Sequence, residues 1–238
     1  MKRREFLWQA ALGAGFAALG PRRQVAQARP TSVTAAGARA RWAELLDYAR
    51  WSPSPHNIQP WKLQVLSETN ARLYYDPTRL LRHTDPTSCF TIIGLGMFIA
   101  SLNIAAGPLG FCIEARHAAE ARLDYGATTP QPFADLRLVP RSGPAPVADR
   151  ELLKQRRTSR LHYDGRPVAA PIQQQLAARA TAQGHQLTFA TDPAMVDFIL
   201  DLNRQTLFTD LDDAATRQEL AGWIRTTDEQ AHTRKDGL

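Results

Sequence analysis

The sequence predicts an α+β fold, in which antiparallel strands pack with long helices. Three observations predict it. A hydrophobic share of 44% among 238 residues is enough for a core of ordinary size. Short alternating segments are separated by turn residues, as in antiparallel hairpins. Other segments carry apolar residues at helical spacing, and the two kinds of segment are mixed along the chain.

The first elements are a helix, a hairpin and a second helix. Apolar residues at helical spacing predict a helix from about residue 38 to residue 50, which ends before a pair of prolines. Residues 62–67 and 71–76 alternate around a polar turn, so they predict a hairpin. Residues 90–106 carry no formal charge. They predict a helix that is apolar on all sides, and therefore buried in a core or an interface.

Punctuation in the middle of the chain predicts a boundary between two units. Five prolines lie between Pro130 and Pro146, more densely than anywhere else. We therefore expect a first unit over residues 38–146 and a second over residues 147–238. Further strands are predicted at residues 111–117, 121–125 and 136–140.

Three helices and one strand are predicted in the second unit. A helix follows Pro171 and ends at Gly184, and a strand spans residues 185–191. Asp192-Pro193 is a normal cap and first-turn pair, so it predicts the start of another helix. A last helix covers about residues 214–230.

The composition excludes several classes of protein. Two cysteines cannot form a disulfide scaffold, and a bridge between Cys89 and Cys112 is not expected, because the intervening helix separates them. Disordered, collagenous and multi-span membrane chains are excluded as well, since proline and glycine contents are ordinary and apolar stretches are short.

The N-terminus has the parts of an export signal. Arg3-Arg4 precedes a weakly apolar stretch over residues 6–20, and Ala26-Gln27-Ala28 offers small residues for cleavage after residue 28. Arg3-Arg4-x-Phe6-Leu7 resembles a twin-arginine signal, so we expect a periplasmic protein that the twin-arginine translocase carries in folded form. A short N-terminal anchor helix is the alternative, although a membrane span needs about 20 apolar residues.

This signal also accounts for most of the positive charge. The whole chain has 29 Lys+Arg and 23 Asp+Glu, a formal charge of +6. Removal of residues 1–28 leaves 24 and 22, so the mature chain is near +2. Nucleic-acid binding needs clustered positive charge, and no nucleic-acid partner is expected.

The segment Ser52–Trp61 is the most informative motif. Its sequence is Ser-Pro-Ser-Pro-His-Asn-Ile-Gln-Pro-Trp, so its prolines fix a turn between a helix and a strand. Ser54, His56, Asn57 and Gln59 then present donors and acceptors from a rigid backbone, which suits a flat polar heterocycle. The alternative is a structural turn whose serine and asparagine cap their own backbone.

Arg156-Arg157-Thr158-Ser159-Arg160 is the second motif. Three guanidinium groups and two hydroxyls in five residues could clamp a phosphate, because arginine makes bidentate contacts with phosphate oxygens. The alternative is a solvated basic surface, which is the usual role of short basic runs.

Together the two motifs resemble the flavin-binding nitroreductase family. The resemblance implies an FMN cofactor and a nitroreductase-like fold. It implies an oxidoreductase that passes electrons through the flavin to a small electron-poor acceptor. The expected donor is NAD(P)H or, because nicotinamide nucleotides are scarce outside the cytoplasm, a different compound. The implied phosphate ligands are Arg156, Thr158 and Arg160, and the implied contacts to the edge of the flavin ring are Pro53, Ser54, Pro55 and Asn57.

The order of the motifs resembles the tandem Acg-like branch, in which two degenerate units form an intramolecular pseudo-dimer; a homodimer is the alternative. Asp85-Pro86 and Trp223-Ile224-Arg225 followed by Asp236-Gly237-Leu238 also look like that branch. There the second unit continues beyond this region, so we expect either a fragment or a shortened member. An FMN-binding or sequestering protein without efficient turnover, or a scaffold without flavin, is the alternative function.

Overall fold

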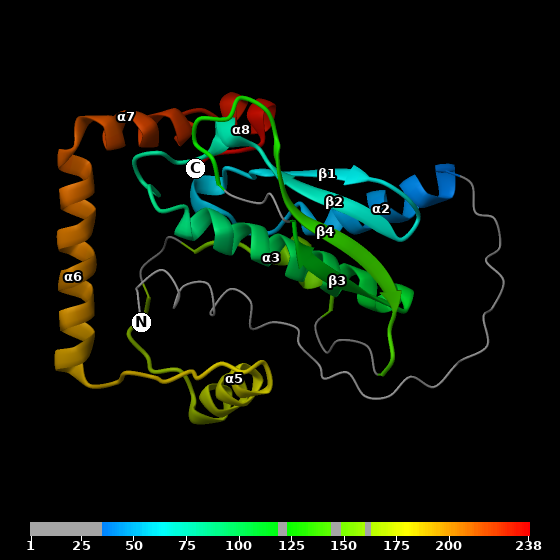
Figure 1. Cartoon of the computed structure of the whole chain (residues 1–238). Helices are drawn as coiled ribbons and strands as arrows, with labels where there is room; N and C mark the ends of the chain where they lie inside the picture. The colour runs from blue at the N-terminus through cyan, green and yellow to red at the C-terminus, as the bar shows by residue number, and fades with distance from the viewer. Residues whose placement is uncertain (1–34, 119–122, 144–148, 160–162) are drawn as a thin grey trace. The chain divides into compact units, whose positions relative to one another are not determined.

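A computed structural model of the chain describes residues 35–118, 123–143, 149–159 and 163–238 (Figure 1). The chain forms two compact units. Among the described residues, the sheet unit comprises those in the ranges 35–156 and 215–238, and the helical unit comprises those in the range 157–214. The predicted signal peptide over residues 1–28 lies outside the described residues.

The sheet unit contains a four-stranded antiparallel sheet in the order β1-β2-β4-β3. The α+β prediction is therefore confirmed. The strands are β1 (Trp61–Val65), β2 (Asn70–Tyr75), β3 (Phe111–His117) and β4 (Gln131–Pro140). The hairpin of β1 and β2 lies where the alternating pattern predicted it. Strand β4 begins five residues earlier than predicted, and its pairing with β2 shifts between Leu73 and Tyr74, where Pro132 has no N–H to donate.

The predicted strand at residues 121–125 is wrong as far as it can be followed. Residues 121 and 122 lie outside the described residues, and residues 123–125 form no strand. The backbone N–H of Asp124 donates to the hydroxyl of Tyr75 (2.6 Å) instead of to a neighbouring strand. A tertiary contact to β2 has therefore replaced the strand pairing that the alternation favoured.

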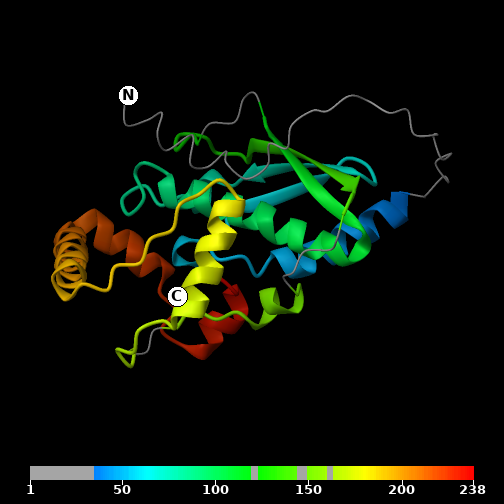
Figure 2. The ribbon, with the colours of Figure 1, turned by 90° about the horizontal axis from the view of Figure 1, so that it is seen from below.

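Two helices, α2 (Ala35–Ala49) and α3 (Cys89–Ala106), pack against each other and against the sheet (Figures 1 and 2). Buried residues alternate along β2, at Ala71, Leu73 and Tyr75, so one face of the sheet meets the helices. The core between these layers also holds large side chains of both helices and of β4: Trp42, Leu45, Leu95, Phe98, Leu102, Leu136 and Leu138.

Helix α3 lies where it was predicted, but it is not buried on all sides. Phe90 and Ile93 are 60% and 48% exposed. By length and composition alone, Cys89–Leu109 could cross a membrane, with a mean hydropathy of 2.0, and 44% of the scored window is buried inside the protein. Cys89 and Cys112, at the start of α3 and in β3, are both free.

The short helix α4 (Glu151–Gln155) packs on α2 and belongs to the sheet unit. The sheet unit therefore extends beyond the boundary predicted between residues 146 and 147. The Tyr48 hydroxyl donates to Glu151 (2.6 Å), and Arg150 forms an ion pair with Glu44 (2.9 Å). That the chain consists of two nitroreductase-like units stays a prediction. Three 3-10 helices complete the first part of this unit: η1 (Pro55–Asn57), η2 (Pro77–Arg79) and η3 (Gly107–Leu109).

The single helix predicted at residues 214–230 is wrong, because two helices occupy this region. Helix α7 spans Ala214–Trp223 and α8 spans Asp228–Arg234. Thr227 has an extended backbone, and its hydroxyl accepts a hydrogen bond from the N–H of Gln230 (3.2 Å). A threonine that caps a new helix in this way ends the continuous helical pattern.

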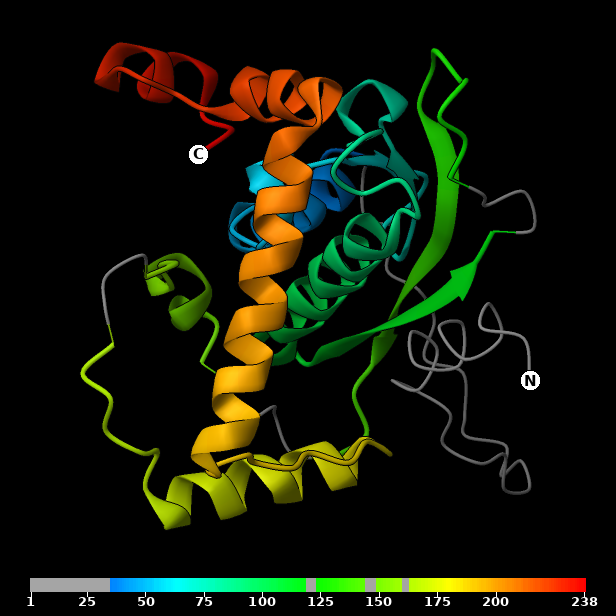
Figure 3. The same ribbon diagram turned by 90° about the vertical axis from the view of Figure 1, so that its left-hand side faces the viewer.

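The helical unit contains α5 (Ala170–Ala182) and α6 (Pro193–Asp212), the latter seen along its length in Figure 3. As predicted, Asp192 caps α6, and its carboxylate accepts from the N–H of Met195 (2.9 Å). The strand predicted at residues 185–191 is wrong, since these residues have no regular structure. The described residues of this unit include no other strand with which it could pair.

Candidate functional site

The proline-rich segment, residues 52–60, connects α2 to β1 through a turn with an uncommon backbone. His56, Asn57 and Gln59 have left-handed φ angles of 45°, 53° and 47°. Residues other than glycine rarely adopt this region, and each such residue costs about 1 kcal/mol or more. Contacts around the turn must therefore hold it in place.

Internal hydrogen bonds and helix α3 provide part of that support. The Ser54 hydroxyl accepts from the backbone N–H of Gln59 (3.0 Å), and the N–H of Asn57 donates to the Ser54 carbonyl (3.0 Å). Helix α3 passes close by, since a Cβ atom at Gly94 would lie 3.5 Å from Cδ of Pro55. The predicted ring contacts Pro53, Ser54, Pro55 and Asn57 thus share one rigid turn.

The rest of the support comes from a segment 180 residues away. The Asn57 side-chain amide donates to the carbonyl of Gly237 (3.2 Å), and that of Gln59 donates to the carbonyl of Lys235 (2.7 Å). Gln59 also donates to Oδ1 of Asn57 (3.2 Å), so the two amides orient each other. Residues 235–238, the docked segment, therefore lie on the turn.

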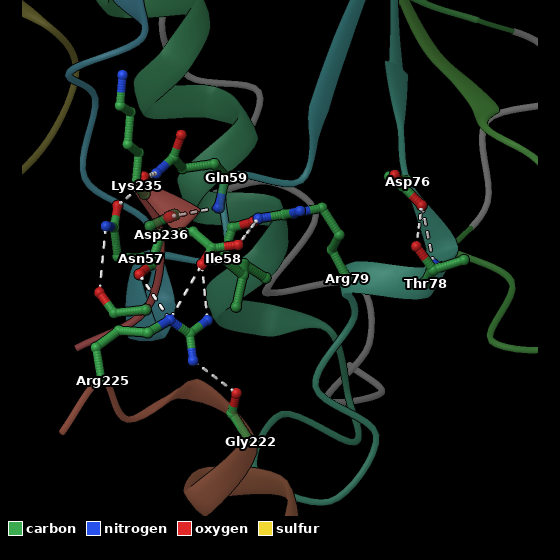
Figure 4. A network of polar contacts seen from close by, with 12 residues as sticks. Asn57, Ile58, Gln59, Asp76, Thr78, Arg79, Gly222, Arg225, Lys235 and Asp236 are labelled. Atoms are coloured by element: carbon green, nitrogen blue, oxygen red, sulfur yellow. Dashed lines mark hydrogen bonds and ion pairs between the residues drawn. The ribbon is translucent and has the colours of Figure 1, made fainter. Parts of the chain in front are cut away.

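An ion-pair network fixes the docked segment (Figure 4). Asp236 accepts from Arg79 through one carboxylate oxygen (2.5 Å) and from Arg225 through the other (2.7 Å). Arg79 also donates to the carbonyl of Ile58 in the turn. The Arg225 and Asp236 side chains are only 6% and 14% exposed. The network therefore joins η2, the turn and the chain after α7 in a nearly buried position.

Asp236 stays ionised because its partners outweigh its burial. Burial by itself raises the pKa of this carboxyl group, whereas the hydrogen bonds and charges of Arg225 and Arg79 lower it. The net effect is a pKa below the ordinary aspartate value. The carboxylate is consequently a fixed negative charge between two guanidinium groups.

Gly237 is required by a close approach of the backbone. Its φ is 78°, and a Cβ atom there would lie 2.3 Å from the carbonyl oxygen of Trp223. That carbonyl accepts from the N–H of Leu238 (2.7 Å), and the N–H of Arg225 donates to the Leu238 carbonyl (2.7 Å). Any side chain at position 237 would separate these paired backbones.

Asp85 has a structural role beside this site. It is buried, and one of its carboxylate oxygens accepts from both the N–H and the hydroxyl of Thr91 (2.8 Å each). Its other oxygen accepts from the N–H of Phe90 (3.2 Å), so Asp85 caps the start of α3. Glu219 of α7 accepts from the N–H and hydroxyl of Thr84 (2.8 and 2.9 Å), which fastens α7 to the same loop.

The arginine motif is placed only in part. Arg156 follows α4, is exposed, and donates through Nη2 to the backbone carbonyl of Trp51 (3.5 Å), next to the proline turn. Thr158 is exposed and belongs to the helical unit, and Arg160 lies outside the described residues. The structure therefore brings one predicted phosphate ligand beside the predicted ring contacts.

The turn has donors and acceptors left over that could hydrogen-bond a polar ring. The Asn57 amide donates one of its two hydrogens to Gly237, and its oxygen accepts one hydrogen from Gln59. One amide hydrogen and one oxygen lone pair therefore remain for a ring carbonyl or nitrogen. Ser52 is 3% exposed, and its buried hydroxyl has no hydrogen-bond partner among the residues that the structure describes. A bound polar group would supply one.

The sequence motifs did not predict the central charges of this site. Arg79 carried no signal, since a lone arginine after a proline has no distinctive spacing. Arg225 and Asp236 belong to the segments that carry the family resemblance, but no other pattern marks them.

Neither the protein-family models nor the curated proteins compared with this chain include a match to it. In the described ranges, no group of three or more His, Cys, Asp or Glu could hold a metal ion.

Proposed function

We propose that the protein is an exported FMN-binding oxidoreductase of the nitroreductase type, which passes electrons through the flavin to a small electron-poor acceptor. One observation carries the proposal. The proline turn and the Trp223–Leu238 region, two segments that resemble the tandem branch, meet in a single network through Asn57, Arg225 and Asp236. This contact between the two segments supports the proposal.

The residues of this chain would bind and orient the cofactor. Arg156, Thr158 and Arg160 would hold the ribityl phosphate through charge-assisted hydrogen bonds. Ser54 and Asn57 would hydrogen-bond the edge of the ring, with Pro53 and Pro55 against it. The flavin supplies the electron-transfer chemistry when bound, so no side-chain acid or base is assigned.

The experiment is an FMN-binding measurement on full-length protein. We expect the purified protein to be yellow, and Arg156→Ala with Arg160→Ala to weaken FMN binding at least 100-fold, because each lost charge-assisted contact costs about 1.5–3 kcal/mol. Arg116→Ala is the control, since Arg116 is exposed on β3. An unchanged FMN affinity in the double variant would show that the phosphate assignment is wrong.

A sequestering protein without efficient turnover is the second candidate. The observation that favours it is the docked segment, which already engages the amides of Asn57 and Gln59. Anaerobic mixing of the FMN-loaded protein with NADPH separates the two functions. Loss of the visible flavin absorbance within seconds, followed by recovery on addition of a nitroaromatic acceptor, would exclude sequestration.

A further inference from the structure

A hollow beside the docked segment gathers positive charge. It has a volume of about 280 Å³. Its walls come from the residue after α2, the turn, β1, η2, the last residue of α8 and the chain that follows it. The lining residues are Arg50, Gln59, Trp61, Lys62, Arg79, Arg234, Lys235 and Asp236.

The charges of this basic hollow do not cancel. Five of its side chains are cationic and one is anionic. The one carboxylate, Asp236, is already shared between Arg79 and Arg225, and Lys62 pairs with Asp76 at 3.5 Å. Within the described ranges, Arg50, Arg234 and Lys235 have no carboxylate within 4.0 Å.

The fold brings these cations together from distant parts of the sequence. Arg50 and Arg234 are separated by more than 180 positions, so the cluster is not a basic run of the sequence. The backbone of Lys235 is fixed by a hydrogen bond, because its carbonyl accepts from the Gln59 side chain (2.7 Å). Its φ is 55°. Arg79 is fixed by Ile58 and Asp236. Like charges held at close range repel each other, and a bound anion relieves that repulsion.

The walls indicate what kind of anion fits. Trp61 is the one aromatic residue of the lining, and its ring is stacked on Phe98 with centroids 4.8 Å apart. One face of this ring is therefore already covered, and every other lining residue is charged or carries an amide. The volume is just below the range of roughly 300–1,000 Å³ typical of sites for drug-sized ligands. Guanidinium and ammonium groups recognise phosphate oxygens through charge-assisted hydrogen bonds.

We propose that the basic hollow binds the phosphate group of a small phosphate-bearing ligand through Arg50, Arg234 and Lys235, with Lys62 and Arg79 adding to the positive field. This site does not depend on the proposed flavin function, because none of its residues belongs to the predicted phosphate clamp. The phosphate could come from FMN itself or from a separate phosphorylated compound.

The experiment is isothermal titration calorimetry of the full-length protein, freed of any flavin, with inorganic pyrophosphate at constant ionic strength. We expect saturable binding that weakens at least tenfold in Arg50→Gln with Arg234→Gln. Both side chains are exposed, so the fold should persist, and a circular dichroism spectrum checks this. Arg116→Gln removes a positive charge on the distant strand β3 and should leave binding unchanged.

The outcomes separate cleanly. No saturable pyrophosphate binding, or equal weakening by Arg116→Gln, would overturn the proposal. Equal binding by the folded double variant and the native protein would overturn it as well. A second titration after saturation with FMN identifies the source of the phosphate. Loss of pyrophosphate binding would assign the hollow to the FMN phosphate, and retained binding would assign it to a separate ligand. Failure of FMN to bind would refute the flavin function and leave this site standing.

Discussion

The two units of the chain differ in how their helices are stabilised. In the sheet unit, α2 and α3 bury large side chains such as Trp42 and Phe98 against the sheet. In the helical unit, α5 and α6 bury no residue at all. Both kinds of helix nevertheless form where the sequence predicts them. Helix formation therefore follows local signals, whereas burial depends on what the fold provides to pack against.

Helix α6 makes this difference concrete. Met195, Phe198, Ile199 and Leu202 recur at the spacing of one helix face, and each is at least 44% exposed. The start of α6 is defined by its capping residue Asp192 and by the proline that follows it. A stripe of this kind normally meets a partner, and the described residues of the helical unit supply none.

The largest expected effect contrasts two phenylalanines, one in each unit. Phe98 is fully buried in α3, so Phe98→Ala should cost the sheet unit about 3–5 kcal/mol of unfolding free energy. Phe198 is 63% exposed in α6, so Phe198→Ala should change stability by less than about 0.5 kcal/mol. Urea unfolding followed by far-ultraviolet circular dichroism checks both, because this signal reports on the helices of both units.

The same pair of variants can contradict the difference between the two units. If Phe198→Ala destabilises the protein as much as Phe98→Ala does, the apolar face of α6 is packed in solution. The contrast between a buried and an uncovered set of helices would then be wrong.

A second contrast uses two glycines with nearly equal backbone angles. Gly237 has a φ of 78° and Gly184 a φ of 77°. A Cβ atom at Gly184 meets nothing within 4 Å, so Gly184→Ala should cost only the strain of the left-handed backbone, about 1 kcal/mol. A Cβ atom at Gly237 would collide with the Trp223 carbonyl, so Gly237→Ala should cost about 3 kcal/mol or release the docked segment.

Hydrogen exchange distinguishes these outcomes at Leu238, whose N–H donates to Trp223. We expect that N–H to lose its protection in Gly237→Ala and to keep it in Gly184→Ala. Equal effects of the two variants would show that the docked segment contributes little to the turn.

The parts of the fold that were predictable are those with local causes. The hairpin at residues 62–76 follows from alternation, and the start of α6 follows from Asp192-Pro193. The strands expected at residues 121–125 and 185–191 are wrong for a shared reason. An alternating segment becomes a strand only when another strand pairs with it, and pairing is a tertiary property that alternation does not encode.

The sequence predicted the proline turn of the site, but it did not predict the contacts that hold this turn. Clustered prolines and polar residues indicated a rigid segment at Ser54 and Asn57, and in the structure hydrogen bonds brace this segment. The partner of Asn57 is Gly237, and the charge that fixes Gly237 comes from Asp236 and Arg79. Nothing in the spacing of these residues relates them, because contacts across 150 or more positions depend on the whole topology.

The smallest effect contrasts two aspartates, and it depends on pH. Hydrogen bonds from Arg166 lower the pKa of Asp164 in the helical unit, but this pair is exposed to solvent. The Asp236 carboxylate is mostly buried between Arg79 and Arg225. We expect Asp236→Asn to cost about 2 kcal/mol near neutral pH, as for other hydrogen bonds to charged groups, and Asp164→Asn to have no measurable effect.

The sign of the pH dependence follows from the lowered pKa of Asp236. An unfolded chain takes up a proton on this carboxyl group at a higher pH than the folded protein does, so the stabilisation is fully present above the ordinary value of 3.8. It is lost as the pH falls through the lower, folded pKa. Urea unfolding of the native protein and Asp236→Asn between neutral and acid pH should give curves that converge in acid. A stability difference independent of pH would mean that Asp236 acts through its shape and not its charge.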